Sequence, residues 1–201
     1  DNEDKLEYYL EDSLPQDIDY ILKSAQRMDK LLKELLKLSR ITVNNLDKER
    51  VDTRQLITNL RDNFAYQLQE KEADLIIKDL PNCYCDQEQL KRVFANLFDN
   101  AIKYLDPAED IKLEVNGWDL KERVVYAVAD NGRGIAASEQ EEIFDIFSRV
   151  SHESSISGEG IGLALIKEII NLHQGQIWLE SKEGIGSIFF VSIPDLRFLE
   201  D

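Results

Sequence analysis

The chain is short of basic residues, cysteine, histidine and long hydrophobic runs. It has 24 Lys and Arg against 40 Asp and Glu, a net charge of −16, and a pI near 4.6. A field of this sign repels phosphate backbones and anionic lipid, which disfavours nucleic-acid binding and membrane contact. No run approaches the ~20 apolar residues of a membrane span, and residues 1–5 are acidic where a secretory signal is basic. An anionic ligand therefore needs a local site of its own.

The two cysteines, Cys83 and Cys85, are separated by one residue. Residues at i and i+2 share one face of a strand, and a pair so close rarely forms an unstrained disulfide. Two thiolates without further Cys or a nearby His make a poor zinc site. The pair is predicted to be two reduced thiols in a strand, which fits a reducing compartment.

The composition predicts a folded protein of one domain with a helical appendage, since 43% of the 201 residues are hydrophobic and 32% are charged. Two apolar series repeat every seven positions within residues 15–43: Ile18, Ala25 and Leu32, and Ile21, Met28 and Leu35. Interleaved heptads of this kind predict a helix that packs along a partner helix. Residues 1–45 are therefore predicted to be a helical region through which the chain dimerises.

A polar stretch without periodicity, residues 42–52, separates this helix from a second region, residues 46–201. Helices are expected after Asp52 and Asp86 and from Ile161 to about His173, and a turn is expected at Gly117. Short apolar or alternating segments predict strands at residues 75–77, 83–85, 111–115, 124–128, 176–180 and 187–193. The order predicts an α+β fold, a two-layer α/β sandwich with a mixed sheet and helices on one face.

The first group of residues that could bind a ligand lies on the helix expected after Asp86. Asn96, Asn100 and Lys103 are spaced at i, i+4 and i+7, so they share one helix face. An amide oxygen can ligate Mg²⁺, and a lysine one turn further on can meet phosphate. Taken alone, such residues are usually the solvent face of an amphipathic helix.

Two glycine-rich patches follow. Asp130, Gly132 and Gly134 come directly after a strand, where glycines let the backbone approach a ligand and a carboxylate can accept a hydrogen bond from an exocyclic amine. Residues 158–162, Gly-Glu-Gly-Ile-Gly, open a helix, whose first N–H groups attract an anion. Between them lies Phe144-Asp-Ile-Phe147-Ser-Arg149, which alone indicates two core aromatics and a surface arginine.

In this order, and with Gly184-Ile-Gly186-Ser187 near the end, the patches resemble the histidine-kinase branch of the superfamily that also contains gyrase, the Hsp90 chaperone and the mismatch-repair protein MutL. The resemblance covers roughly residues 50–195. The segment from Ser24 to Arg40 also resembles the second helix of a kinase dimerisation and phosphotransfer domain. The chain is thus identified as a sensor histidine kinase of two-component signalling, a transferase, with residues 1–45 as a truncated dimerisation region and residues 46–201 as the catalytic ATP-binding domain.

The resemblance implies a site for ATP and Mg²⁺. It implies that Asn100 ligates the metal, that Asp130 binds the adenine amino group, and that residues of about 148–160 form a lid over ATP. The full set of residues that it implies for ATP binding is Asn96, Asn100, Lys103, Tyr104, Asp130, Gly132, Gly134, Ile135, Arg149, Gly158, Gly160, Gly162, Leu163 and Ser187.

The resemblance also implies that the γ-phosphoryl of ATP passes to a histidine and then to an aspartate of a response regulator. The acceptor histidine of the family lies on a helix ahead of this chain, and neither His152 nor His173 matches it. No catalytic residue is therefore assigned within the chain, which is expected to be part of a homodimeric kinase in the cytoplasm, free or in a membrane-anchored sensor.

Two alternatives stay open. One is a pseudokinase that acts as a dimeric scaffold, with or without nucleotide, against which the complete asparagine and glycine patches argue. The other is a hydrolysing ATPase clamp. Asn96 stands where the hydrolysing relatives carry a glutamate base, and because an amide cannot usefully accept a proton from water, hydrolysis is disfavoured.

Overall fold

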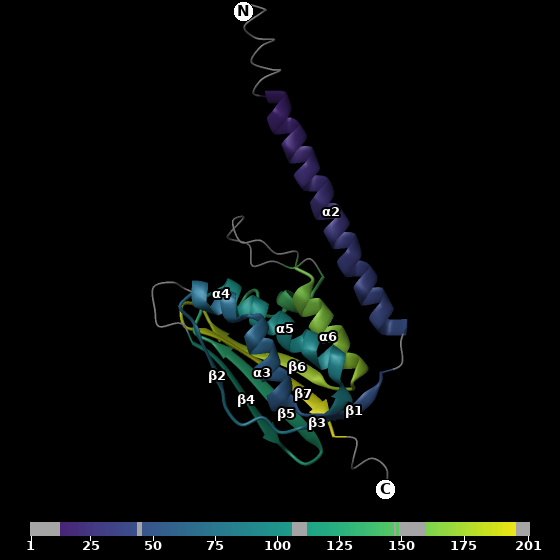
Figure 1. Cartoon of the computed structure of the whole chain (residues 1–201), viewed down its shortest axis with the longest axis vertical. Coiled ribbons are helices and arrows are strands. Elements are labelled where there is room, and N and C mark those ends of the chain that lie inside the picture. Colours follow the sequence, from purple (N-terminus) through teal and green to yellow (C-terminus); the bar gives the residue numbers. More distant parts are fainter. Residues whose placement is uncertain (1–12, 44–45, 106–111, 147, 149–159, 196–201) are drawn as a thin grey trace, which may run out of the picture. The chain divides into compact units, whose positions relative to one another are not determined.

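The computed structural model describes residues 13–43, 46–105, 112–146, 148 and 160–195 (Figure 1). The chain forms two compact units, residues 1–43 and 44–201. In the first unit, the described residues form the long helix α2 (Leu14–Val43), as the heptad pattern predicts, and Pro15 lies in its first turn, where a missing N–H costs no helical hydrogen bond. Apolar side chains on α2 are largely exposed, namely Leu14, Ile18, Ile21, Leu22, Met28 and Leu32. No helix within the described ranges combines the length and apolar character that crossing a membrane requires.

The second unit is a two-layer sandwich. Its helices are α3 (Thr53–Asn63), α4 (Ala65–Glu70), α5 (Gln87–Lys103), the 3₁₀ turn η2 (Glu142–Phe144) and α6 (Gly162–Leu172). Its strands are β1 (Lys48–Val51), β2 (Asp74–Ile77), β3 (Cys83–Asp86), β4 (Lys112–Asp119), β5 (Arg123–Asp130), β6 (Gln176–Lys182) and β7 (Gly186–Pro194). A five-stranded sheet runs in the order β2-β4-β5-β7-β6, with β2 and β4 parallel and the other pairs antiparallel. The predicted mixed sheet is therefore confirmed.

Helices α3, α5 and α6 lie on the same side of this sheet (Figure 1). The register puts Val115, Val128 and Phe189 side by side across β4, β5 and β7, and all three are buried beneath the helices. From α5, Phe94 meets Tyr126 edge-on with ring centres 5.5 Å apart. Burial of a side chain of this size contributes about 1.5–3 kcal/mol to the stability of the fold. The buried face of α5 therefore stabilises the packing of the helix layer on the sheet.

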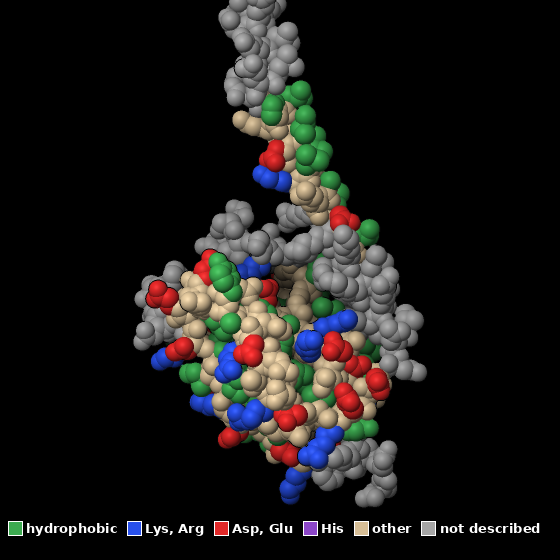
Figure 2. Space-filling model, in the orientation of Figure 1, with side chains coloured by type: hydrophobic (Ala, Val, Ile, Leu, Met, Phe, Trp, Pro, Cys, Tyr) green, Lys and Arg blue, Asp and Glu red, His purple; other side chains and the backbone are tan. Residues whose placement is uncertain are grey.

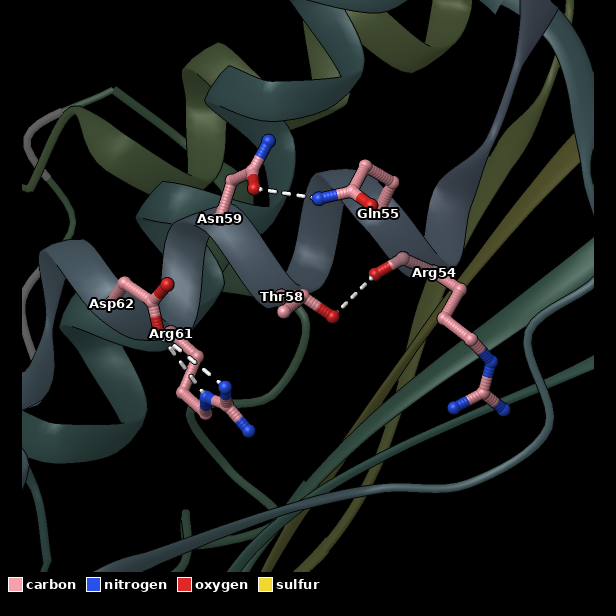
Figure 3. A network of polar contacts seen from close by, with 6 residues as sticks. All are labelled: Arg54, Gln55, Thr58, Asn59, Arg61 and Asp62. Atoms are coloured by element: carbon pink, nitrogen blue, oxygen red, sulfur yellow. Dashed lines mark hydrogen bonds and ion pairs between the residues drawn. The ribbon is translucent and has the colours of Figure 1, made fainter.

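The exposed face of α3 carries short-range polar contacts rather than core (Figure 3). Gln55 Nε2 donates to Asn59 Oδ1 at 2.8 Å, and the guanidinium of Arg61 lies 3.4 Å from an oxygen of Asp62. Exposed contacts of this kind contribute about 0–1 kcal/mol, so these side chains serve as neutral sites for control substitutions. Acidic and basic side chains are mixed over the side of the second unit in Figure 2.

Three details differ from the sequence-based expectations. Strand β1 was missed, because Lys-Glu-Arg-Val has no apolar alternation, although it pairs with β3 over its whole length. Gly117 lies inside β4, and the turn falls at residues 120–122, where Lys121 has a φ of 70°. The helix expected after Asp52 is broken at Phe64, which caps α3 and starts α4.

The cysteines lie on one face of β3, as predicted. Both are buried and neither forms a disulfide, and their Sγ atoms are 3.2 Å apart. The Thr53 hydroxyl lies 3.8 Å from Cys83 Sγ and 2.8 Å from the Tyr126 hydroxyl, which donates to the Pro81 carbonyl. The thiols thus form part of a buried polar cluster under α3.

A buried histidine links α6 to the start of α5. Asp86 caps α5 by accepting from the Gln89 N–H at 3.0 Å, as predicted, and its own N–H donates to His173 Nε2 at 3.1 Å. The other ring nitrogen, Nδ1, lies 2.8 Å from the Ile169 carbonyl, to which it donates. This pattern needs a neutral ring with its proton on Nδ1, and burial lowers the pKa of His173 below 6.5.

We expect this histidine to make the fold sensitive to acid. Since its pKa is lower in the folded chain, the unfolded chain takes up the proton first, and stability is lost as pH falls below about 6.5. Urea unfolding of the wild type and of His173→Gln between pH 7.5 and 5 measures this difference. The wild type should lose more stability than the variant over this range, and parallel curves would contradict the role of the ring.

Candidate functional site

Asp130 ends β5 at the edge of the helix layer. Its Oδ1 accepts the Gly132 N–H at 3.0 Å, and it pairs across the sheet with Ser187 of β7. Burial raises the pKa of the carboxyl from 3.8 to about 6, although the backbone N–H groups of Gly132 and Ser187 act in the opposite direction. A partly desolvated carboxylate held by backbone donors is a directional acceptor for an N–H group of a ligand.

Three glycines let separate segments close around this carboxylate. A Cβ on Gly132 would lie 2.5 Å from the Tyr104 carbonyl oxygen, at the end of α5. A Cβ on Gly134 would lie 2.1 Å from the Lys182 oxygen, and one on Gly186 would lie 2.1 Å from the Asp130 oxygen. The end of α5, the first glycine patch and the β6–β7 turn are therefore in backbone contact, which no larger residue at these positions allows.

The asparagine patch faces the second glycine patch. Asn96 Nδ2 donates to the Arg92 carbonyl of its own helix at 2.8 Å, and its Oδ1 lies 3.1 Å from where a Cβ of Gly162 would be. Asn100 lies one turn further along α5, on the same face. Amide oxygens on this face can serve as neutral ligands of a hard cation.

Helix α6 begins at Gly162, opposite Asn96. Its N-cap residue is Ile161, whose side chain makes no capping hydrogen bond. A helix start without a side-chain cap leaves backbone N–H groups to a ligand, and the positive end of the helix dipole favours an anion there. Gly160, with a φ of 68°, and Leu163 flank this start. Arg149, Gly158 and most of the predicted lid lie outside the described residues.

Two cations lie close to one aromatic ring at the end of α5. The Tyr104 ring has Lys103 Nζ 5.5 Å and the Arg133 guanidinium carbon 4.5 Å from its centre. In a chain of net charge −16, this pair supplies local positive charge beside the asparagine patch.

The sequence did not predict two residues, Ser181 and Gln140, whose hydrogen bonds fix the backbone that follows the first glycine patch. Ser181 Oγ accepts the Ile135 N–H at 2.8 Å and lies 2.9 Å from both the Gly186 carbonyl and the Ser187 hydroxyl. Gln140 Nε2 donates to the carbonyls of Ile135 and Ser181. The register of β6 against β7, which sets Ser181 opposite Ser187, would have indicated Ser181, whereas no local pattern indicates Gln140.

Comparison with known proteins defines the class. Residues 85–197 match the family described as histidine kinase-, DNA gyrase B-, and HSP90-like ATPase. This match covers Asn96, Asp130, both glycine patches and Ser187, and the chain therefore belongs to this ATP-binding family.

Among curated proteins, the chain is 36% identical over 176 residues to the adaptive-response sensory kinase SasA of Thermosynechococcus vestitus, covering 85% of the chain and 46% of SasA. It is 34% identical over 177 residues to the phytochrome-like protein Cph1 of Synechocystis sp. strain PCC 6803, covering 88% of the chain and 24% of Cph1. The chain thus spans less than half the length of these relatives.

Solved structures have the same fold. Full-length ShkA in complex with AMPPNP aligns with a TM-score of 0.72 at 23% identity, over 90% of this chain and 38% of that one. The histidine kinase ThkA in complex with the response regulator TrrA aligns with a TM-score of 0.66 at 23% identity, over 92% of this chain and 52% of that one.

Proposed function

We propose that residues 46–201 are the catalytic ATP-binding domain of a sensor histidine kinase, and that residues 1–45 belong to its dimerisation and phosphotransfer region. Family membership supports the ATP site, and the names of SasA and ThkA support the kinase assignment. The observation that carries the proposal is the Asp130 carboxylate, partly buried at a strand end and fixed by the Gly132 N–H. An acceptor of this geometry fits the 6-amino group of adenine.

In this proposal the rest of the site binds the triphosphate. The start of α6, with Gly160, Gly162 and Leu163, offers N–H groups to the phosphates, and Lys103 adds a positive charge. Asn100 would hold Mg²⁺ through its amide oxygen, while Asn96 would face the phosphates, and the ion would offset phosphate charge when bound. Ile135 and Gly134 shape the adenine end, with Ser187 and Ser181 behind them.

Transfer, rather than hydrolysis, follows from Asn96. Its amide nitrogen donates to the Arg92 carbonyl, and an amide oxygen is too weak a base to activate water. The γ-phosphoryl then passes to a histidine outside this chain, and from there to an aspartate of a response regulator. Both ring nitrogens of His173 are engaged in backbone hydrogen bonds, which supports its exclusion as the acceptor.

The proposal includes two protein partners and a location. The exposed apolar stripe of α2 supports a homodimer through the helical region. The ThkA–TrrA complex supports a response regulator as the second partner. A kinase that meets such a regulator works in the cytoplasm, whether or not a membrane anchors the rest of it.

We expect Asn100→Ala to remove most of the Mg²⁺-dependent part of ATP affinity, since the variant lacks an amide oxygen ligand. Titration with ATP, with and without Mg²⁺, measures this part as the ratio of two dissociation constants. Asn59→Ala on the exposed face of α3 is the matched control and should leave the ratio unchanged. A ratio in Asn100→Ala equal to that of the wild type would exclude the metal role.

A further inference from the structure

Arg133 lies between two site glycines but was not among the predicted site residues. Its guanidinium carbon is 4.5 Å from the centre of the Tyr104 ring. A planar guanidinium at this distance is attracted by the electron-rich face of the ring and can cover it, with a gain of about 0.5–2 kcal/mol. The side chain of Arg133 therefore restrains the ring of Tyr104.

The backbone of Arg133 is fixed on both sides. Its N–H donates to the Tyr104 carbonyl at 3.2 Å, and its own carbonyl accepts the Gly184 N–H at 2.6 Å. At the preceding residue, Gly132, a Cβ would lie only 2.5 Å from the Tyr104 carbonyl oxygen, so only glycine allows this close approach of the two backbones. Because main chain and side chain both meet Tyr104, Arg133 is the point at which α5 joins the β6–β7 turn.

Tyr104 caps α5 and is partly buried, so its ring direction is set by its neighbours rather than by the helix. We propose that Arg133 is a positioning residue of the nucleotide site, which holds the Tyr104 ring in one orientation so that the base of an adenine nucleotide meets a preformed wall. A ring already in place costs the ligand less ordering free energy on binding. The inference rests on the proposed function, and it takes Tyr104 as one of the ATP-binding residues that the family resemblance implies; a Cβ on Gly132 would lie close to both the Tyr104 carbonyl oxygen, at 2.5 Å, and Asp130 Oδ1, at 3.0 Å.

A direct contact between the Arg133 charge and the phosphates is the competing role, and the two roles differ in what they require of the ligand. A restrained ring acts on the base, so its loss weakens adenosine, ADP and ATP by the same factor. A phosphate contact acts through charge, so its loss weakens the ligand more as phosphates are added.

The test is calorimetric titration of adenosine, ADP and ATP into the wild type, Arg133→Ala, Tyr104→Leu and the double variant. We expect Arg133→Ala to weaken all three ligands about 3- to 10-fold, with partial recovery in Arg133→Lys, which keeps a cation near the ring. The double variant should bind no more weakly than Tyr104→Leu, because the arginine acts through the ring. Arg61→Ala, which also removes one positive charge, is the matched control and should bind as the wild type does.

Three results of the titrations would overturn the inference: no loss in Arg133→Ala, a loss that grows with phosphate number, or a loss of the same size in the Tyr104→Leu background. A measurement without nucleotide distinguishes a failure of the Arg133 inference from a failure of the proposed function. The Arg133 side-chain Nε–H resonance should be shifted by the ring current of Tyr104 and return to its ordinary position in Tyr104→Leu, and an unshifted resonance would overturn the stacking. A shifted resonance in a wild type that binds no adenine ligand would instead overturn the proposed function, and with it the role of Arg133.

Discussion

Asp130→Asn is expected to abolish measurable binding of adenine nucleotides while making the nucleotide-free domain more stable. In the proposed site the carboxylate accepts a hydrogen bond from the amino group of the base, whereas an asparagine turned to keep the Gly132 N–H on its oxygen would present N–H groups to the ligand. Calorimetric titration with ATP measures the first effect. Asp62→Asn on the exposed face of α3 is the control and should bind ATP normally.

The gain in stability follows from the pKa of Asp130, which burial raises from 3.8 to about 6. The folded chain holds this proton more tightly than the unfolded chain, so the favourable contribution is present below about pH 4 and is lost as pH rises through 6. At pH 7 the ionised group costs the fold about 2–3 kcal/mol, at ~1.4 kcal/mol per pKa unit. We therefore expect Asp130→Asn to raise the free energy of urea unfolding by up to about 2 kcal/mol at pH 7, and the gain to vanish near pH 4. A variant that is less stable at pH 7 and still binds ATP would contradict both parts.

Gly134→Ala is expected to have the largest effect on folding, and Gly184→Ala is its matched control. Both glycines have a positive φ, 67° and 74°, which costs alanine about 1–2 kcal/mol. They differ in the room for a side chain. A Cβ on Gly134 would lie 2.1 Å from the Lys182 oxygen, while nothing lies within 4 Å of a Cβ on Gly184. The Lys182 oxygen belongs to the backbone of β6 and cannot move without breaking the strand pairing.

We expect Gly184→Ala to lower the free energy of unfolding by about 1 kcal/mol and Gly134→Ala by several times more, with loss of ATP binding. Urea unfolding followed by circular dichroism, together with ATP titration, measures both. Equal losses in the two variants would mean that backbone conformation alone matters at these positions. The close approach of β6 to the first glycine patch would then be wrong.

Much of this fold is readable in the sequence where one local signal dominates. The apolar stripe of α5 and the Asp86 cap predict that helix, alternation predicts β4, and the apolar run that contains Val124, Tyr126 and Val128 predicts β5, which is buried on both faces. Strand β1 has no such signal, because its pairing with β3 comes from a segment more than thirty residues away. Gly117 was predicted in a turn because it is a glycine, yet its place in β4 is explained by the Tyr126 ring, 2.8 Å from where its Cβ would be.

The order of the motifs was also readable, and the matched family agrees with it. What could not be read is how the site is supported. Ser181 and Gln140 contact backbone groups more than forty residues away in the chain, and Arg133 contacts the ring of Tyr104, so their residue types carry no local pattern. Supporting residues of this kind become visible only when the strands are paired and the helix ends are in place.

The most direct test of the central claim is calorimetric titration of the chain with ATP, with and without Mg²⁺. An adenine site at Asp130, with Asn100 on α5 as the metal ligand, predicts saturable binding in the micromolar range that Mg²⁺ strengthens. Absence of binding heat at several temperatures would contradict the account and favour a dimeric pseudokinase scaffold instead.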